Sequence, residues 1–243
     1  MSNAVSAVII GNEVLTAKVT EANAALLIRR FRERGVELAS VHFIRDEVDE
    51  IVEQLTACRR RTKFIITSGG VGPTHDDVTV RAVSLALKRD VVRLPEMEAR
   101  IRSFFETRGA VPPEALRMAE APSGSRLLPS EDIRFPVLAC DGIYMLPGVP
   151  QLFRVHLETV LKELPGKPVV LRQLFLDASE SEIAATLDAV AMSKPHVAIG
   201  SYPTWDNADY RVKLTVEHVD AAEVDAVTDA LKSSLAKFIV REG

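Results

Sequence analysis

A dozen residues, SGGVGPTHDDVT at 68–79, constrain the fold more than any other stretch of the chain. They follow a short apolar run, 64–67, whose length and glycine flank favour a buried parallel strand over a piece of helix. Apolar residues then recur at helical spacing from 80 to 87, and Asp76 or Asp77 is placed to cap the first helical turn. The stretch therefore predicts a buried strand, a glycine turn and a helix start in immediate succession.

Glycine turns of this kind suit a phosphate ligand. Without side chains the backbone can turn sharply and bring its N–H groups close to a ligand, and the following helix N-terminus adds partial positive charge. The stretch lacks the Gly-Lys-Ser/Thr ending of a P-loop, and His75 stands where a dinucleotide fingerprint requires its third glycine. Neither standard motif fits, so an ordinary strand-to-helix turn remains the alternative.

The adjacent aspartates favour a functional site over that alternative. One carboxylate can cap the helix, but the second must be solvated, paired or bound to a cation. A pyrophosphate held near a helix terminus commonly carries a divalent metal, for which carboxylate oxygens are suitable ligands. Asp76 and Asp77 are therefore candidate metal ligands, and the sequence does not indicate which of them binds metal and which caps the helix.

Composition limits the partners of this chain. The formal net charge of −4 and a pI near 5.8 give no general attraction to nucleic acid or anionic lipid, so any phosphate affinity must be local. The first apolar run, 5–10, is too short for the core of a signal peptide, and Cys58 and Cys140 stand far apart, as reduced thiols do in the cytosol. We therefore expect a cytoplasmic protein that binds neither membrane nor nucleic acid.

Residues 1–165 predict an α/β domain. Strands at 5–10, 36–43 and 64–67 alternate with helices at 20–34, 47–59 and 78–88. This is the order of βαβ units. Asp46 resembles the N-cap of the second helix.

The rest of this domain is less regular. A helix is expected at 95–108, followed by a loop or a broken helical excursion at 109–126. Strands at 135–140 and 143–146 then form a hairpin about Asp141-Gly142, and 147–150 leads into an amphipathic helix.

Three strand ends are expected to meet at one crevice. Ligands of open α/β sheets bind beyond the carboxyl ends of the strands, so junctions 69–79 and 147–150 could share a site with the first junction, 11–15. Glu13 would belong to that site, with a solvated loop charge as the alternative. For Asn23 the alternative is a helix cap.

Residues 168–243 predict a second, small domain of α+β type. After a linker at 166–168 come strand 169–176, helix 180–192, strands 197–202 and 210–219, and helix 222–239, in the order βαββα. A KH nucleic-acid module has a related order but needs a GXXG loop, which this part of the chain lacks. Lys213 could reach an anion or simply be solvated, and Trp205 is interpreted as covering the interdomain surface rather than stacking on a ligand.

Several of these motifs occur together: Gly11-Asn12-Glu13-Val14-Leu15, Asn23, Asp46, the stretch 68–79 and Leu146-Pro147-Gly148-Val149-Pro150. In combination they resemble the CinA N-terminal domain of the MoaB/Mog molybdopterin-binding superfamily. The loop 200–205 with 210–215 is similar to the molybdopterin-binding-like domain of eukaryotic FAD synthases. The chain departs from the CinA pattern at Gln151-Leu152 and at 128–132, so an acidic contact there is not carried over.

The resemblance implies a three-layer αβα domain with a mostly parallel sheet, a site at the strand ends and a homo-oligomeric assembly. For the CinA-type and FAD-synthase-type branches it implies metal-dependent hydrolysis of a dinucleotide pyrophosphate, such as FAD or ADP-ribose, to AMP. The alternatives are molybdopterin binding or adenylylation in molybdenum cofactor biosynthesis, and a nucleotide-binding module without turnover.

The resemblance also implies roles for individual residues. Asp76 or Asp77 would bind Mg²⁺, Mn²⁺ or Co²⁺, and Glu13 or Asp46 would position the metal or the attacking water. Residues expected to contact the nucleotide or its phosphates are Gly11, Asn23, Ser68, Gly69, Gly70, Gly72, Thr74, Pro147, Gly148 and Lys213.

Overall fold

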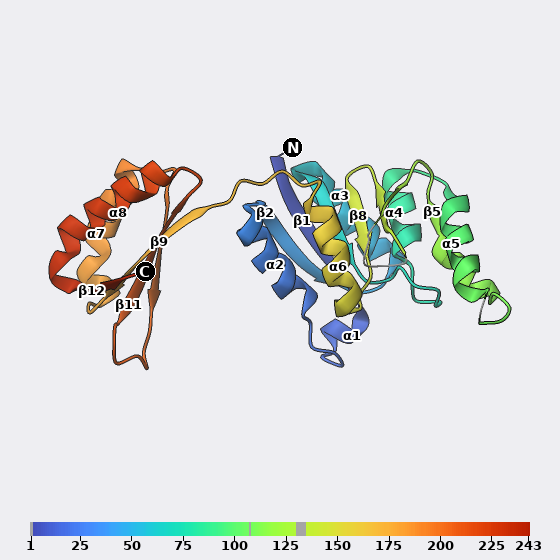
Figure 1. Ribbon diagram of the computed structural model, residues 1–243, viewed down its shortest axis with the longest axis horizontal. Helices are drawn as coiled ribbons and strands as arrows, with labels where there is room; N and C mark the ends of the chain where they lie inside the picture. The colour runs from blue at the N-terminus through green and yellow to red at the C-terminus, as the bar shows by residue number, and fades with distance from the viewer. Residues whose placement is uncertain (1, 107, 130–134) are drawn as a thin grey trace. The chain divides into compact units, whose positions relative to one another are not determined.

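The computed structural model describes residues 2–106, 108–129 and 135–243, which divide into two compact units, Met1–Gly166 and Lys167–Gly243 (Figure 1). We refer to them as unit 1 and unit 2. Among the residues described, no helix combines the length and the apolar character needed to cross a membrane.

Unit 1 is built on a six-stranded sheet. Its strands, in spatial order, are β2 (Leu38–Ile44), β1 (Ser2–Ile10), β3 (Thr62–Ser68), β8 (Ile143–Leu146), β7 (Val137–Cys140) and β6 (Arg126–Leu128). The first four strands are parallel, and the last two join them in antiparallel pairs. Asp141 and Gly142 both have positive φ, 46° and 81°, as the primed turn predicted between β7 and β8 requires. The mostly parallel sheet is confirmed.

Helices cover both faces of this sheet. Helices α2 (Asn23–Arg34) and α6 (Pro150–Leu161) pack side by side on one face, and α3 (Val48–Arg61) and α4 (Thr79–Leu87) cover the other (Figure 1). Successive residues of β1 separate accordingly, since Ala7 faces the first helix pair and Val8 the second. The three-layer αβα arrangement is therefore confirmed.

Segment 91–122 forms a small annex to unit 1. It comprises β4 (Val91–Arg93), α5 (Pro95–Phe105), the 3₁₀ helix η1 (Pro113–Ala119) and β5 (Glu120–Pro122), with β4 and β5 paired. The annex has a small hydrophobic core of its own, formed by Met97, Ile101, Ala115 and Ala119. The broken helical excursion expected at 109–126 is present as η1, whereas the helix expected to reach 108 ends at Phe105.

Unit 2 is an antiparallel sheet covered by helices on one face. Its elements are β9 (Val170–Leu176), α7 (Glu180–Ser193), β10 (Ala198–Pro203), β11 (Val212–His218), α8 (Ala221–Leu235), the 3₁₀ helix η2 (Ala236–Phe238) and β12 (Ile239–Glu242). The spatial order is β10-β11-β9-β12, and every pair is antiparallel. This βαββαβ order is that of a ferredoxin-like split βαβ unit.

The last strand was not predicted. The helix expected over 222–239 ends at Leu235, and the chain then pairs with β9. Phe238 still packs on the core of unit 2. In the sequence it therefore extends the apolar face of the expected helix, and the pattern does not show that the helix has ended. The predicted order βαββα is therefore corrected to βαββαβ.

Candidate functional site

Three glycines lie where β3 and β8 end, and we call Gly69, Gly70 and Gly148 the glycine cradle. Gly69 and Gly70 have φ values of 103° and 68°, which residues with side chains rarely adopt. A Cβ atom on Gly69 would lie 2.2 Å from the carbonyl oxygen of Ile10, and one on Gly148 would lie 3.4 Å from the Gly69 Cα atom. The backbones at the ends of β1, β3 and β8 therefore meet closely, and the end of β1 leaves no room for a side chain at Gly69.

Thr79 fixes the start of α4 against the cradle. Its hydroxyl donates to the Gly69 carbonyl oxygen at 2.8 Å, and its backbone N–H donates to the Gly70 carbonyl oxygen at 2.9 Å. The N-cap of α4 is Val78, with no side-chain cap. The prediction that Asp76 or Asp77 caps this helix is therefore wrong, because the backbone of the glycine turn already occupies the place of the cap.

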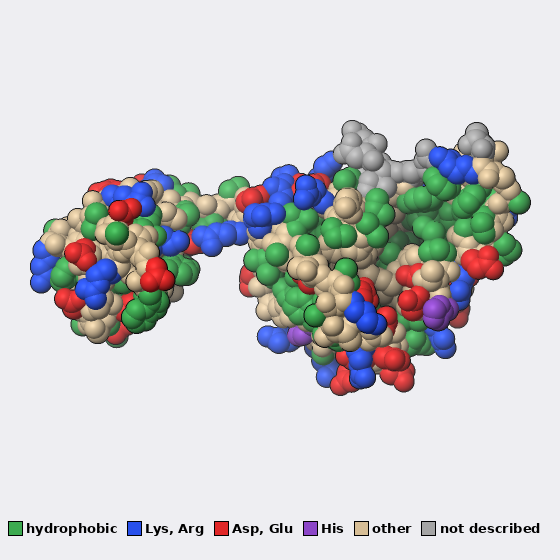
Figure 2. All heavy atoms as spheres, turned by 90° about the horizontal axis from the view of Figure 1, so that it is seen from below, with side chains coloured by type: hydrophobic (Ala, Val, Ile, Leu, Met, Phe, Trp, Pro, Cys, Tyr) green, Lys and Arg blue, Asp and Glu red, His purple; other side chains and the backbone are tan. Residues whose placement is uncertain are grey.

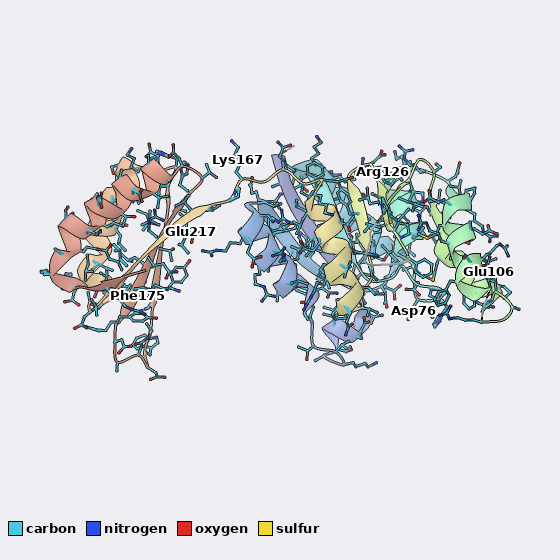
Figure 3. All side chains as sticks on the ribbon, viewed as in Figure 1. Asp76, Glu106, Arg126, Lys167, Phe175 and Glu217 are labelled. Carbon is cyan, nitrogen blue, oxygen red and sulfur yellow. The ribbon has the colours of Figure 1, made fainter. Side chains whose placement is uncertain are left out.

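The two aspartates instead have different surroundings. Asp77 Oδ2 accepts the backbone N–H of Thr74 at 2.7 Å as well as its hydroxyl, and so closes the turn 74–77. Asp76 is exposed, with His75 Nδ1 3.9 Å from Oδ1 (Figure 3). The nearby Thr74 hydroxyl and the backbone N–H of Asp76 itself lower the pKa of the Asp76 carboxyl, which is therefore ionised at neutral pH.

Asn23 joins two of the strand ends. Its side-chain nitrogen donates to Ser68 Oγ at 2.9 Å and to the Gly148 carbonyl oxygen at 2.8 Å, and its buried Oδ1 has no hydrogen-bond partner among the described residues. Helix α2 begins at Asn23 itself, and the carboxylate that accepts a first-turn N–H, that of Ala24, belongs to Glu21. Asn23 is therefore not the helix cap.

The first junction contains α1 (Asn12–Leu15), a short helix that the sequence did not predict. The side-chain amide of Asn12 donates to Asp46 Oδ1, which ties this helix to the end of β2. The N-cap of α3 is Glu47, so the cap predicted at Asp46 is wrong. Glu13, one residue further, is exposed at the mouth of a cavity.

That cavity has a volume of about 930 Å³ and lies entirely within unit 1. The strand-end junctions form one side of it. The opposite side, which we call the apolar wall, comprises Val91, Met97, Met118, Phe135 and Leu138. Figure 2 shows unit 1 hollowed on this face, with hydrophobic side chains inside and charged side chains around the opening. Its size matches that of cavities that enclose a nucleotide-sized ligand.

The structure brings most of the predicted site residues to this cavity. Those that line it are Glu13, Asn23, Ser68, Gly69, Gly70, Gly72, Asp77, Pro147 and Gly148. Four further predicted residues follow the ends of β1, β2 and β3 without lining the cavity: Gly11, Asp46, Thr74 and Asp76.

The remaining predictions fall elsewhere. Lys213 is on β11 of unit 2, with its Nζ atom 5.2 Å from the centre of the Tyr202 ring. Trp205 is 95% exposed, and its expected role at an interdomain surface stays a prediction. Positions 130–132, within the departure from the CinA pattern, lie outside the described residues.

Carboxylates line the cavity without forming a ready metal centre. Within 2–106, 108–129 and 135–243, no group of three or more His, Cys, Asp or Glu side chains could hold a metal ion. Asp77 and Glu13 both face the cavity, and Asp77 Oδ1 accepts no hydrogen bond from a described residue. Mg²⁺ is commonly held by one or two carboxylates together with the phosphates of a substrate. The residues present therefore fit a cation that arrives with a phosphate ligand.

Sequence reasoning missed several polar residues of the cavity, among them Arg81, Arg117, Glu120 and His156. Arg81, on the first turn of α4, and Arg117, on η1, both line it, and neither makes an ion pair within the described part of the chain. His156 on α6 also lines it and is almost fully buried. Arg81 follows the glycine turn closely enough for its helical position to have indicated it, but nothing in the sequence places Arg117 or His156 near the strand ends.

Family models match both units. The model described as "Probable molybdopterin binding domain" matches residues 6–174, and the model described as "FAD synthase, middle domain" matches residues 168–242. The match over unit 1 agrees with the molybdopterin-binding family that the resemblance implied.

Individual relatives agree with these matches. A "Probable FAD synthase" of Caenorhabditis elegans is 29% identical over 96% of this chain and 50% of its own length, and a "CinA-like protein" of Thermomicrobium roseum is 29% identical over 95% and 60%. The chain thus spans about half the length of the FAD synthase relative. A protein of Aeropyrum pernix is 31% identical over 80% of this chain and 76% of its own length.

A solved structure supports the fold. The crystal structure titled "the protein CinA with unknown function from Thermoplasma acidophilum" is 27% identical, with a TM-score of 0.61, and the match covers 68% of this chain and 100% of that chain.

Proposed function

The chain belongs to the molybdopterin-binding domain family, with CinA-like relatives, and from that premise we propose that it is a divalent-metal-dependent nucleotide pyrophosphatase. Its substrate would be a dinucleotide such as FAD or ADP-ribose. Its products would be AMP and the other half of the substrate, which keeps the second phosphate.

The observation that carries this proposal is the glycine cradle at the edge of the cavity. Positive φ values at Gly69 and Gly70 turn the chain sharply at the end of β3, and both residues line the cavity. Backbone N–H groups at a strand-to-helix turn are suitable donors for phosphate oxygens, and α4 begins at this turn. The Gly69 N–H already donates to the Leu146 carbonyl oxygen, so the donors would come from the residues that follow it. A diphosphate would therefore be bound where the three strand ends meet.

Two arginines could complete the diphosphate site. Arg81 and Arg117 approach the cavity from α4 and η1, and neither is committed to a carboxylate among the described residues. A guanidinium group can donate two parallel hydrogen bonds to a phosphate and carries its charge at any physiological pH. Because the overall charge of the chain is negative, these two side chains supply the local attraction that a polyanion requires.

The carboxylates of Asp77 and Glu13 would hold the divalent cation jointly with the substrate phosphates. When bound, such a cation polarises the phosphoryl oxygens and lowers the pKa of a water molecule. The turn 74–77 orients Asp77 through its bonds from Thr74. Glu13, exposed at the mouth, would accept a proton from the attacking water. Asp46 is bound to Asn12 and does not line the cavity, so we assign Glu13 rather than Asp46 to this role.

A second function, pterin binding, shares the same cavity. The apolar wall could pack against a pterin ring as readily as against a nucleotide base, and the family model itself is described by molybdopterin binding. Adenylylation of such a pterin, or nucleotide binding without turnover, would use the same glycine cradle.

Release of AMP distinguishes these possibilities. We expect purified protein incubated with Mg²⁺, Mn²⁺ or Co²⁺ to release AMP from FAD or ADP-ribose, and Asp77→Asn to abolish most of this release. Asp76→Asn is the matched control, since Asp76 lies outside the cavity lining, and it should retain most activity. Tight binding of a pterin with no AMP from any dinucleotide would favour the second function. Undiminished AMP release by Asp77→Asn would refute the role of that carboxylate.

A further inference from the structure

Gly11 and Gly72 each lie beside a carboxylate that lines the cavity. A Cβ atom added to Gly72 would stand 2.6 Å from Asp77 Oδ2, and one added to Gly11 would stand 2.5 Å from Glu13 Oε1. Both separations are too short for a carbon and an oxygen that are not bonded to each other. Each carboxylate therefore occupies the space that a side chain on the neighbouring glycine would fill.

The backbone conformation does not require glycine at either position. Gly11 has an extended backbone with a φ of 160°, and Gly72 is not among the glycines with positive φ, unlike Gly69 and Gly70. The obstacles differ as well. A Cβ atom on Gly69 would meet a backbone oxygen, whereas those on Gly11 and Gly72 would meet the ends of side chains. The missing Cβ atoms at 11 and 72 therefore leave room for the carboxylates rather than for the turn of the chain.

Gly11 is not free to make the phosphate contact that the sequence suggests. Its backbone N–H donates to the carbonyl oxygen of Ile44 at 3.1 Å, which joins the end of β1 to the end of β2. Gly11 itself is buried, whereas Glu13 is exposed and lines the cavity. Any effect of Gly11 on a ligand in the cavity is therefore expected to act through Glu13.

At Gly72 the open space coincides with the hydrogen bonds that hold the carboxylate. Asp77 Oδ2 accepts the backbone N–H of Thr74 at 2.7 Å and the Thr74 hydroxyl as well. The same oxygen would be displaced by a Cβ atom on Gly72. Asp77 is only half-buried, so its carboxylate remains accessible from the cavity that it lines. A methyl group at 72 would therefore move this carboxylate away from the donors that orient it.

We propose that Gly72 and Gly11 are positioning residues, which leave the space that Asp77 and Glu13 need in order to bind a cation in the cavity. The proposal rests on the proposed function and deepens it, because the cation is the one that would accompany the diphosphate. Groups that orient a metal-binding carboxylate without touching the metal typically change its affinity about 10- to 100-fold when they are replaced.

The test measures cation binding without turnover. Mn²⁺ is titrated into protein saturated with α,β-methylene-ADP, whose bridging carbon prevents cleavage between the phosphates, and free Mn²⁺ is followed by electron paramagnetic resonance. Gly72→Ala should bind Mn²⁺ about 10-fold more weakly than wild type. Gly11→Ala should bind it about threefold more weakly, because the longer side chain of Glu13 can bend around a methyl group. Both variants should melt within about 2 °C of wild type, since only a side-chain end must move.

A double variant and a control separate positioning from other effects. Once Asp77→Ala has removed the carboxylate, Gly72→Ala should cause no further loss of Mn²⁺ affinity. Gly200→Ala is the matched control, because its Cβ atom would stand 2.7 Å from side-chain atoms of Tyr202 and Thr215 in unit 2, neither of which is a carboxylate. It should bind Mn²⁺ as wild type does.

Three results would overturn the proposal. The first is unchanged Mn²⁺ affinity in both glycine variants. The second is an equal loss from Gly72→Ala when the Asp77 carboxylate is already absent. The third is weaker binding of α,β-methylene-ADP by Gly72→Ala in the presence of EDTA, which would show that the glycine acts directly on the phosphates.

The outcome is independent of hydrolysis. Absence of AMP release from FAD or ADP-ribose would refute the pyrophosphatase function while leaving a loss of Mn²⁺ affinity in the glycine variants intact. Absence of Mn²⁺ binding in wild-type protein would refute the cation site and this proposal with it.

Discussion

The two sides of the cavity are built by different means. On the side of the glycine cradle, backbone segments at the ends of β1, β3 and β8 contact one another directly, and their geometry excludes a side chain at Gly69. On the side of the apolar wall, side chains from the annex at 91–122 and from the start of β7 define the surface. The first side is fixed by backbone conformation and the second by side-chain packing.

This difference separates what the site must preserve from what it can vary. A phosphate is recognised by N–H groups whose positions depend on φ and ψ, so substitutions in the cradle act through the backbone. A ring is recognised by shape and by one or two polar atoms, so substitutions in the wall act on selectivity. The predictions below test this contrast, beginning with the largest effect.

Gly69→Ala should cause the largest loss. Its φ of 103° is unfavourable for alanine, and the new Cβ atom would lie 2.2 Å from a backbone oxygen that cannot move aside. Strain and overpacking together should reduce the free energy of unfolding by about 4 kcal/mol. Urea denaturation followed by circular dichroism measures this change.

Gly109→Ala is the matched control for that experiment. Gly109 has a similar φ, 115°, but no atom of the described residues lies within 4 Å of an added Cβ atom. It should therefore cost only the conformational strain, about 1–2 kcal/mol. Equal losses in the two variants would show that strand-end contact is not what excludes a side chain from the cradle.

Ile101→Ala should destabilise the other side of the cavity. Ile101 is buried in the small core of the annex, with Met97 and Ala119. Removing its side chain should cost about 2–3 kcal/mol. Since this core is separate from the two cores that flank the main sheet, amide hydrogen exchange should accelerate in 95–119 and remain slow in β1 and β3. Uniform acceleration throughout unit 1 would contradict the separation.

The two arginines test which side binds a diphosphate. Arg81→Gln should weaken binding of ADP about 10-fold, or about 1.4 kcal/mol, because Arg81 belongs to the helix that starts at the cradle. Arg117→Gln, on the side of the annex, should have a smaller effect of about threefold. Calorimetric titration gives both values. Arg29→Gln, an exposed change on α2 away from the cavity, should bind as wild type does, and an equal loss there would indicate a general charge effect.

The smallest expected effect concerns the ion pair between helices α2 and α6. Arg30 of α2 donates two hydrogen bonds to the Glu158 carboxylate of α6, at 2.6 and 2.8 Å, and these bonds lower the pKa of Glu158 below its ordinary value of 4.5. The stabilisation is therefore present above pH 4.5 and is lost as the pH falls through the lower pKa of the folded state.

Glu158→Gln should remove that pH dependence. Because the pair is partly exposed, its loss should cost no more than about 1 kcal/mol at pH 7. The variant and the wild type should then converge in thermal stability as the pH is lowered from 5 to 3. A difference that grows at low pH would contradict the sign of this effect.

The side of the cavity set by backbone was the side that could be predicted. Gly69 and Gly70 follow a short apolar strand, and both have positive φ. Because glycine adopts positive φ most readily, a turn of this kind can be recognised in the sequence by its glycines. The hairpin at Asp141-Gly142 was predictable for the same reason. Local rules of turn geometry therefore brought β1, β3 and β8 together correctly.

Features that depend on tertiary contacts were not predictable. Arg117 reaches the cavity only because the annex folds onto the sheet, and His156 only because α6 packs on the sheet, and no local pattern encodes either contact. The caps predicted at Asp76 and Asp77 failed because a carbonyl oxygen of the glycine turn already accepts the N–H at the start of α4. The cap predicted at Asp46 failed because its carboxylate binds Asn12 instead. The end of α8 was misplaced because Phe238 is apolar in either conformation.

The pairing of β12 with β9 has a consequence for how unit 2 can be carried by larger proteins. Gly243 exchanges two backbone hydrogen bonds with Gln173, only three residues after the first residue of β9. At about 3.3 Å per residue, the entry and exit of this unit are about 10 Å apart. Units with neighbouring ends are readily inserted between other folded modules, because the host chain is interrupted over a short gap only.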